Sequence, residues 1–262
     1  MKVSDILEFV HTIAPQYMKM DWDNVGLLCG DPDQTVTRIL VALDPFEDVA
    51  NEAIEIGAQL ILTHHPLIFQ PCRSVTEETS VGRTLRLLIR HNISAINAHT
   101  NLDCAPGGVN DVLAQTLGLE DVSVIDPQGQ DAQGRDWGLL RMGTVEEQPL
   151  SRFLVQVKES LGCSGLRYAE GGKPVHRVAV GGGACASELM DAVAAGCDTF
   201  VTSDIKYNQF WDARDNGLNL IDAGHFCTEN PVCTRLQAAV SEKFPEIETV
   251  ISKKHRDCMK FF

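Results

Sequence analysis

The segment LILTHHPLIF, residues 60–69, is an apolar run that ends in two adjacent histidines followed by a proline. The run is short and rich in Leu and Ile, which indicates a buried strand. Immediately before it, EDVANEAIEIG (47–57) has the pattern of a helix that stops at Gly57. RILVAL (38–43) predicts a further buried strand. This strand–helix–strand order is typical of a mainly parallel sheet, and it predicts an α/β fold.

The same order returns in the second half of the chain. EAIEIGAQLILTHH (52–65) aligns without a gap on DAVAAGCDTFVTSD (191–204), so that Gly57 matches Gly196 and Thr63 matches Thr202. Farther on, ISAINAHTNLD (93–103) parallels LNLIDAGHFCTE (218–229) with one extra residue in the second copy. The matching element order favours an internal duplication. The alternative is that any two helix-to-strand units look alike.

The repeats predict the domain organisation. We expect two α/β repeats, at about 1–124 and 137–262, joined by a connection at 125–136. The segment IDPQGQDAQGRDWG (125–138) is rich in Gly, Gln and Asp, which suits an exposed connection or a hairpin. At the N-terminus, apolar residues at helical spacing predict an amphipathic helix that ends before Pro15.

Composition excludes several classes of protein. The chain carries 22 Lys and Arg against 36 Asp and Glu, a formal net charge of −14. This balance argues against a nucleic-acid binder, because such affinity comes mainly from clustered basic residues. The nine cysteines form no C-x-x-C pair, and with no targeting segment we expect reduced thiols in a cytoplasmic protein. No run approaches the roughly 20 apolar residues of a membrane span.

Polar side chains with metal-binding chemistry follow the last apolar residue of four predicted strands. The ligands of open α/β sheets gather at the carboxyl ends of the strands, so we expect these side chains to face one crevice. They are His64, His65, His99 and Asp103 in the first copy, and Ser203, Asp204, His225 and Glu229 in the second.

Two histidines are each followed by a carboxylate four positions later: His99 by Asp103, and His225 by Glu229. A helix starting at His225 would place His225 and Glu229 on one face, whereas Pro106 and Gly108 indicate that His99 and Asp103 lie on a loop. Imidazoles and carboxylates without thiolates suit divalent Zn, Mn, Fe, Co or Ni. Adjacent histidines can serve two metal ions as terminal ligands. The alternative is a structural or surface histidine pair.

Five segments carry a family resemblance. WDNVGLL (22–28), HHPLIF (64–69), AHTNLD (98–103), GGVNDVLA (107–114) and AGHFCTE (223–229) resemble motifs of the NIF-three-like family, whose members are also called GTP cyclohydrolase I type 2 homologs. The resemblance covers essentially the whole chain. It implies two intertwined α/β repeats with mainly parallel, mixed sheets in three α/β/α layers. It also implies a site for two divalent metal ions in the crevice between the lobes, and a toroidal homohexamer built as a trimer of dimers.

The resemblance also implies roles for individual residues. The metal ligands would be His64, His65, Asp103, His225 and Glu229, with Glu229 as the bridge. His99 would lie beside the metals and transfer protons.

The function that the resemblance implies is a metal-dependent hydrolase acting on a small molecule, possibly a nucleotide. Water activated by the two ions would open the guanine ring of GTP or cleave a phosphoester. The alternative is a non-catalytic scaffold that binds metal or a partner.

The segment RVAVGGGACAS (177–187) permits a further hypothesis. Gly181, Gly183 and Ala186 fit the G-x-G-x-x-A pattern of nicotinamide-dinucleotide enzymes, although this leaves the histidines unexplained. The interpretation we favour is a tight turn near the metals, in which Gly182 and Gly183 bind a substrate phosphate.

Other polar and aromatic residues have less specific roles. Family resemblance places Asp23, Asn24 and Gly26 beside the site, and Asn24 is a candidate substrate ligand. Lys206 either meets a substrate anion or is a solvated surface lysine. We expect the three tryptophans and the cysteines next to the ligands to serve packing; these are Trp22, Trp137, Trp211, Cys104 and Cys227.

Overall fold

The computed structural model describes residues 1–262 and shows a mixed α/β fold with a five-stranded sheet, a six-stranded sheet and a two-stranded ribbon. The chain divides into two compact units. Unit 1 comprises Met1–Leu102 and Val232–Arg256, and unit 2 comprises Asp103–Pro231 and Asp257–Phe262. Because each unit combines segments that are distant in sequence, the two are intertwined along the chain.

Unit 1 is built on the five-stranded sheet, in the order β1-β4-β3-β2-β13. Strands β4, β3, β2 and β13 are parallel, and β1 is antiparallel to β4. Its elements are α1 (Val3–Ile13), η1 (Gln16–Met18), β1 (Gly26–Cys29), β2 (Arg38–Ala42), α2 (Glu47–Ile56), β3 (Leu60–Thr63), α3 (Ser80–Arg90), β4 (Ser94–Asn97), α10 (Pro231–Lys243, from its second residue) and β13 (Glu248–Ile251).

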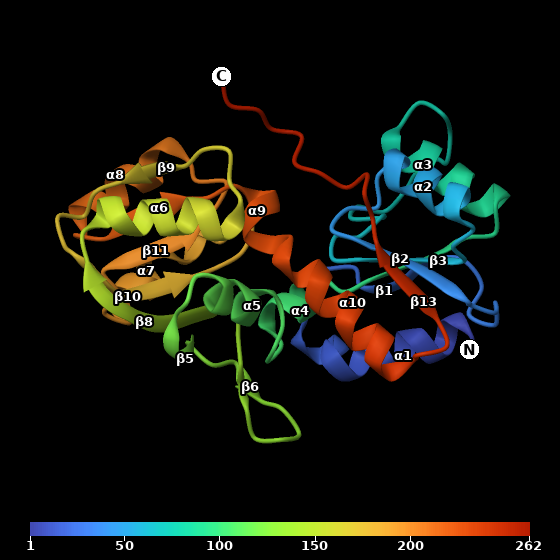
Figure 1. Ribbon diagram of the computed structural model, residues 1–262, viewed down its shortest axis with the longest axis horizontal. Helices are drawn as coiled ribbons and strands as arrows, with labels where there is room; N and C mark the ends of the chain where they lie inside the picture. The colour runs from blue at the N-terminus through green and yellow to red at the C-terminus, as the bar shows by residue number, and fades with distance from the viewer. The chain divides into compact units, whose positions relative to one another are not determined.

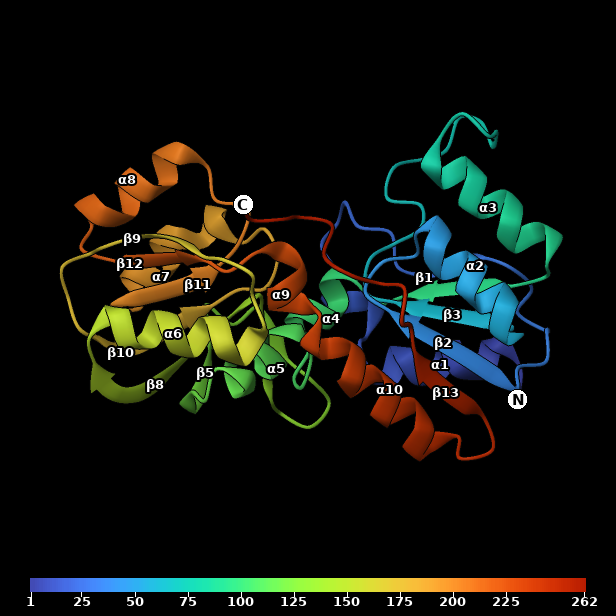
Figure 2. The same cartoon turned by 45° about the horizontal axis from the view of Figure 1, so that its top comes forward.

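Helices cover both faces of this sheet. Figures 1 and 2 show α2 and α3 on one face and α1 and α10 on the other. Alternate strand residues such as Leu40 and Ile61 pack with Val49 of α2 and Leu88 of α3 in one buried cluster. Unit 1 therefore has the predicted α/β/α layering.

Unit 2 is built on the six-stranded sheet, in the order β5-β8-β10-β11-β12-β9. Strands β10, β11 and β12 are parallel to one another. Strand β8 is antiparallel to β10, β5 is antiparallel to β8, and β9 is antiparallel to β12. Its elements are α5 (Val109–Thr116), β5 (Glu120–Ile125), β6 (Gly129–Gln130), β7 (Asp136–Trp137), β8 (Leu140–Gln148), α6 (Leu150–Leu161), β9 (Arg167–Ala169), β10 (Val175–Val180), η2 (Ala186–Glu188), α7 (Leu189–Ala194), β11 (Thr199–Thr202), α8 (Tyr207–Asp215), β12 (Asn219–Asp222) and α9 (His225–Glu229). A short helix, α4 (Thr100–Cys104), carries the chain from unit 1 into unit 2.

Two buried clusters lie on opposite faces of the unit 2 sheet. Val178 and Val201 pack with Phe153 of α6, whereas their neighbours Ala179 and Phe200 belong to the cluster that contains α7. Side chains alternate between the faces of a strand, so both faces of these strands are buried. This explains why their sequences are continuously apolar.

The boundary between the units lies at a different position in the sequence from the predicted connection at 125–136. Residues 125–136 lie inside unit 2, because β5 and β8, on either side of them, pair in one sheet. The predicted hairpin there is confirmed, since β6 and β7 pair antiparallel. The division falls instead at Leu102/Asp103, and β13 returns to unit 1 by pairing with β2.

The aligned segments of the two proposed repeats have the same local structure. Gly57 ends α2 and Gly196 follows α7, with φ of 68° and 76°. Strands β3 and β11 then end at Thr63 and Thr202. The shared glycine is explained by the left-handed turn that leads from each helix into its strand.

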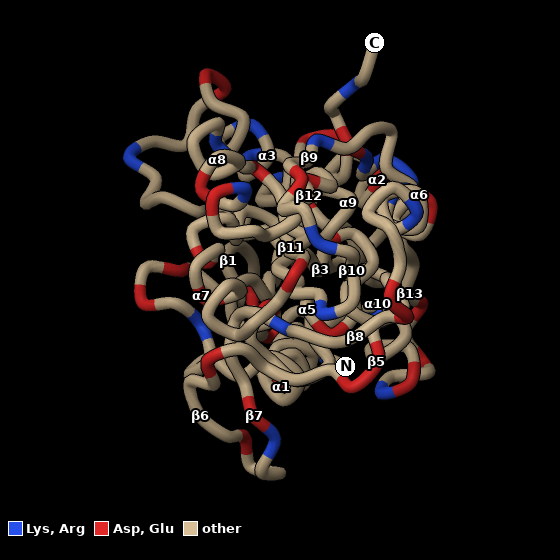
Figure 3. The backbone as a smooth tube through the Cα atoms, turned by 90° about the vertical axis from the view of Figure 1, so that its left-hand side faces the viewer, with Lys and Arg blue, Asp and Glu red and all other residues tan.

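Charged residues are dispersed along the chain. Figure 3 shows Lys and Arg positions interspersed among more numerous Asp and Glu positions, consistent with the net charge of −14. No helix is both long and apolar enough to cross a bilayer. None of the nine cysteines is joined in a disulfide in this structure.

Candidate metal centre

In unit 1, the histidines lie at the carboxyl edge of the parallel strands. Ala42, Thr63 and Asn97 end β2, β3 and β4 in register, so the residues that follow them share this edge. His64 and His65 follow β3, and His99 follows β4 after one residue. Strand order and register therefore bring these three imidazoles together, as the sequence predicted.

The three rings form a close group. Their centroids lie 4.9 Å apart for His64 and His65, 5.2 Å for His64 and His99, and 5.6 Å for His65 and His99. One ligand nitrogen from each ring lies within 4.8 Å of the others. His64 is fully buried, and His99 keeps 15% of its side chain exposed. A ring nitrogen of His99 is therefore a possible metal ligand in this unit. This role would add to the proton transfer predicted for His99.

Each ring is oriented through its Nδ1 atom. Nδ1 of His64 donates to the carbonyl oxygen of Ala98 at 2.9 Å, and Nδ1 of His65 donates to Oδ1 of Asp44 at 2.7 Å. A carbonyl or carboxylate oxygen can only accept, so the Nδ1 atoms carry the protons. Such bonds are the usual support of metal-binding histidines, because they leave Nε2 as the electron-pair donor.

Asp23 supports His99 in the same way. Its carboxylate accepts from Nδ1 of His99 at 2.8 Å and from the backbone N–H of Thr100 at 3.0 Å. Burial favours the neutral carboxyl, but the hydrogen bonds from His99 and Thr100 outweigh it and lower the pKa of Asp23 to about 2. Strand β1 is antiparallel to β4, which is why the segment before it reaches this edge.

In unit 2, His225 and Glu229 form the second group. Helix α9 begins at His225 and ends at Glu229, so the condition that would place these two residues on one helical face is met. Nε2 of His225 lies 3.1 Å from Oε2 of Glu229, and its Nδ1 donates to Oδ2 of Asp204 at 2.7 Å. Asp204 follows β11 in a left-handed backbone conformation, with φ of 53°. Glu229 is 4% exposed, so the carboxylate partner of this pair is buried.

A glycine turn packs against Glu229. A Cβ atom on Gly183 would lie 2.1 Å from Oε1 of Glu229 and 3.1 Å from Nε2 of His225, and φ of Gly183 is +65°. Only glycine fits this position without displacement. The N–H of Gly182 donates to Oδ1 of Asn110 and that of Gly183 to Oγ1 of Thr228. These amides are used within the unit, which weighs against both the phosphate cradle and the dinucleotide hypothesis.

Asp103 also belongs to unit 2 and is 7% exposed. Burial raises the pKa of the Cys185 thiol well above its usual range, and the nearby carboxylates of Asp103 and Glu229 raise it further. Both carboxylates therefore lie near one buried thiol.

The guanidinium of Arg141 donates to the carbonyl oxygen of Cys104 at 3.2 Å, which ties the end of α4 to β8.

The predicted loop between His99 and Asp103 is instead helical. Helix α4 spans Thr100–Cys104 and ends before Pro106, so the proline and glycines that suggested a loop lie beyond it. The loop prediction was wrong for this reason. The unit boundary also separates His99 from Asp103.

Two predicted substrate ligands have structural contacts. Nδ2 of Asn24 donates to the carbonyl oxygen of Ile68 at 2.7 Å, which ties the loop after the double histidine to the segment before β1. Lys206 is exposed and precedes α8, where its N–H donates to Oε1 of Gln209 at 2.8 Å. Their part in substrate binding stays a prediction.

The packing role expected for Trp22 is not observed. The residue is 63% exposed, and its ring meets Phe69 edge-on at 5.7 Å between centroids. The cysteines do pack, since Cys104 is fully buried and Cys227 is 9% exposed.

Sequence reasoning missed two supporting groups. Asp44 holds His65 although we had assigned it no role, and Trp22 with Phe69 forms an exposed pair beside His99. Asp44 could have been found, because it directly follows the predicted strand 38–43, just as His64 follows the next strand. The ring pair has no local signal, because it joins segments 47 positions apart.

Comparison with known proteins identifies the family of the chain. The model of the Duf34/NIF3 (NGG1p interacting factor 3) family matches residues 1–258. The chain belongs to this family. A Clostridium perfringens relative named "GTP cyclohydrolase 1 type 2 homolog" is 36% identical over 263 residues, which cover 100% of both chains.

Solved structures of Duf34/NIF3 relatives share the fold. A Bacillus cereus protein related to NIF3 matches with a TM-score of 0.94 at 26% identity, covering 100% of this chain and 99% of that one. A Staphylococcus aureus protein of the same fold matches with a TM-score of 0.91 at 32% identity and the same coverage.

The lowered pKa of Asp23 predicts a pH-dependent stability. An ionised Asp23 stabilises the fold above the unfolded pKa near 3.8, and this contribution is lost as the pH falls through about 2. In metal-free protein, the Asp23→Asn variant should therefore be less stable at neutral pH, by on the order of 2 kcal/mol. The difference in unfolding free energy should shrink as the pH falls over this range. Urea unfolding of both proteins measures it, and a pH-independent difference would contradict the account.

Gly183 offers a second test with a matched control. Gly196 has a similar positive φ, but a Cβ there would meet nothing within 4 Å. Gly196→Ala should cost about 1–2 kcal/mol of unfolding free energy, from the left-handed backbone alone. Gly183→Ala should cost clearly more, because the new methyl group displaces the Glu229 carboxylate. Equal costs in urea unfolding would show that the turn is not packed on Glu229.

Proposed function

We propose that the chain is a metal-dependent hydrolase that binds two divalent metal ions through His64, His65, Asp103, His225 and Glu229. The observation that carries the proposal is the orientation of the imidazoles. In each unit, an Nδ1–H donates to a carbonyl or carboxylate oxygen, and the ligand nitrogen faces the other way.

The donor set fits divalent metals. Three neutral imidazoles and two carboxylates suit Zn, Mn, Fe, Co or Ni, and the native metal is not fixed by these ligands. The turn at Gly183 fits as well, because the lack of a side chain there lets backbone pack against Glu229. A bridging ligand needs such a fixed position, and Glu229 is the carboxylate we assign to it.

The chain's own residues have distinct tasks in this reaction. Two bound ions would supply Lewis-acid activation of water. Asp44 and Asp204 hold His65 and His225 in one tautomer through their Nδ1 atoms. Asp23 holds the Nδ1 proton of His99, so Nε2 of His99 is the atom that can accept and return a proton.

The substrate we propose is a small molecule, with a nucleotide as the first candidate. Support comes from the relatives named GTP cyclohydrolase 1 type 2 homologs. Because a fold and a ligand set do not identify a substrate, phosphoesters are to be tested beside GTP. A cytoplasmic location is part of the proposal, on the expectation that the cysteines are reduced thiols.

The test is metal content together with turnover. Purified protein loaded with each of the five metals should hold two ions per chain by elemental analysis. It should also hydrolyse GTP or a member of a phosphoester panel. His65→Ala and Glu229→Ala should lose at least about 100-fold of both metal affinity and activity, because each removes a ligand. Asp33→Asn, which changes an exposed carboxylate, is the control.

Two outcomes would decide against the proposal. Metal binding without turnover on any substrate would favour the non-catalytic scaffold. Activity that survives in both ligand variants would show that the chemistry lies elsewhere.

We also propose a homohexamer, on the family resemblance. Light scattering should then give six times the 28.7 kDa of one chain. A monomeric mass would contradict this assembly.

A further inference from the structure

The carboxyl edge of unit 1 carries an exposed aromatic pair, formed by Trp22 and Phe69. The two residues are 63% and 47% exposed, and their ring planes meet at 70°. Each ring also lies against His99, with centroids 6.2 Å and 6.1 Å away. Large exposed rings are costly in water, so a pair held beside a polar cluster indicates a binding surface.

Buried polar contacts fix the position of this pair. Asp23, next to Trp22, accepts hydrogen bonds from His99 and Thr100. Asn24 donates to the carbonyl oxygen of Ile68, next to Phe69. Both rings are thus attached to backbone that cannot move independently of the histidine group. A preorganised surface of this kind binds a ligand at low entropic cost.

We infer that Trp22 and Phe69 form a binding site for the planar nitrogen heterocycle of the substrate, a ring of nucleobase type. The two ring planes meet at 70°, so a flat ligand can stack on the face of one ring and touch the edge of the other. Its polar edge would then reach His99, whose ligand nitrogen lies within 4.8 Å of those of His64 and His65. The inference rests on the proposed function, since it assigns a substrate subsite to the same centre.

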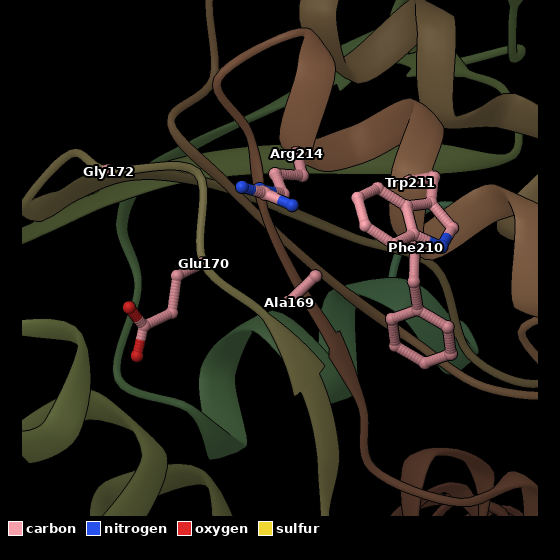
Figure 4. A pocket seen from close by; sticks show the side chains of 6 residues that line it. All are labelled: Ala169, Glu170, Gly172, Phe210, Trp211 and Arg214. Carbon is pink, nitrogen blue, oxygen red and sulfur yellow. The ribbon is translucent and has the colours of Figure 1, made fainter.

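Unit 2 contains a competing aromatic surface. A cavity of about 480 Å³ is lined by Phe210, Trp211 and Arg214 of α8 and by the segment from Ala169 to Gly172. Figure 4 shows Trp211 and Arg214 projecting from α8, with Glu170 on the opposite side. The guanidinium of Arg214 already lies over the Trp211 ring at 5.0 Å, so this face is occupied by the chain itself. Trp211 is therefore the matched control for Trp22.

Binding of guanosine 5′-monophosphate to the metal-free full chain tests the inference by calorimetry. Ribose 5-phosphate, which lacks the heterocycle, should bind at least about tenfold more weakly. Trp22→Ala and Phe69→Ala should each weaken nucleotide binding by roughly tenfold to a hundredfold. Trp22→Phe, which keeps an aromatic ring, should restore part of the affinity, and Trp211→Ala should bind as the unaltered chain does.

Several results would overturn the inference. These are no saturable binding by the unaltered chain, unchanged binding in Trp22→Ala, or loss of binding in Trp211→Ala. A change in molecular mass in Trp22→Ala with intact nucleotide binding would instead make the pair a contact between subunits. Because the assay needs no metal, its failure is distinguishable from failure of the hydrolase proposal. Metal content of Trp22→Ala equal to that of the unaltered chain verifies that the centre is intact.

Discussion

The hydrogen bond at Nδ1 of each histidine is the constraint on which the candidate centre depends. An imidazole with a free choice of tautomer and rotation is a poor metal ligand. Here His64, His65, His99 and His225 are each held by an oxygen acceptor. Three of these acceptors are carboxylates, from Asp44, Asp23 and Asp204, which fix the tautomer and the rotation of the ring they hold. The fold produces this arrangement, because the histidines and most of their acceptors closely follow strands that end in register.

Much of the fold could be predicted from local sequence, because parallel strands buried on both faces leave continuous apolar runs. The strand predicted in the apolar run before His64 is observed as β3 at Leu60–Thr63, and the predicted helix at 47–57 as α2 at Glu47–Ile56. What local patterns could not show was the pairing of distant segments. The pairing of β13 with β2 joins Glu248 to Arg38 and moves the unit boundary away from the predicted connection.

The residues of the candidate centre also differ in whether local sequence could identify them. Histidines at strand ends could be selected because strand topology alone brings them to one edge. Their carboxylate supports could be found only in part: Asp44 directly follows the predicted strand at 38–43, whereas the place of Asp23 beside His99 depends on the pairing of β1 with β4. The exposure of Trp22 was missed for a related reason: its surroundings are set by the loop after His65, not by its neighbours in sequence.

The central proposal is that His64, His65, Asp103, His225 and Glu229 bind one pair of divalent metal ions. Anomalous scattering at the metal edge, from crystals soaked in a divalent metal, tests it most directly. The account predicts two neighbouring peaks, with Nε2 of His64, His65 and His225 directed at them and Glu229 between them. Peaks that involve the histidines of unit 1 alone, with Glu229 and Asp103 remote from any metal, would contradict it.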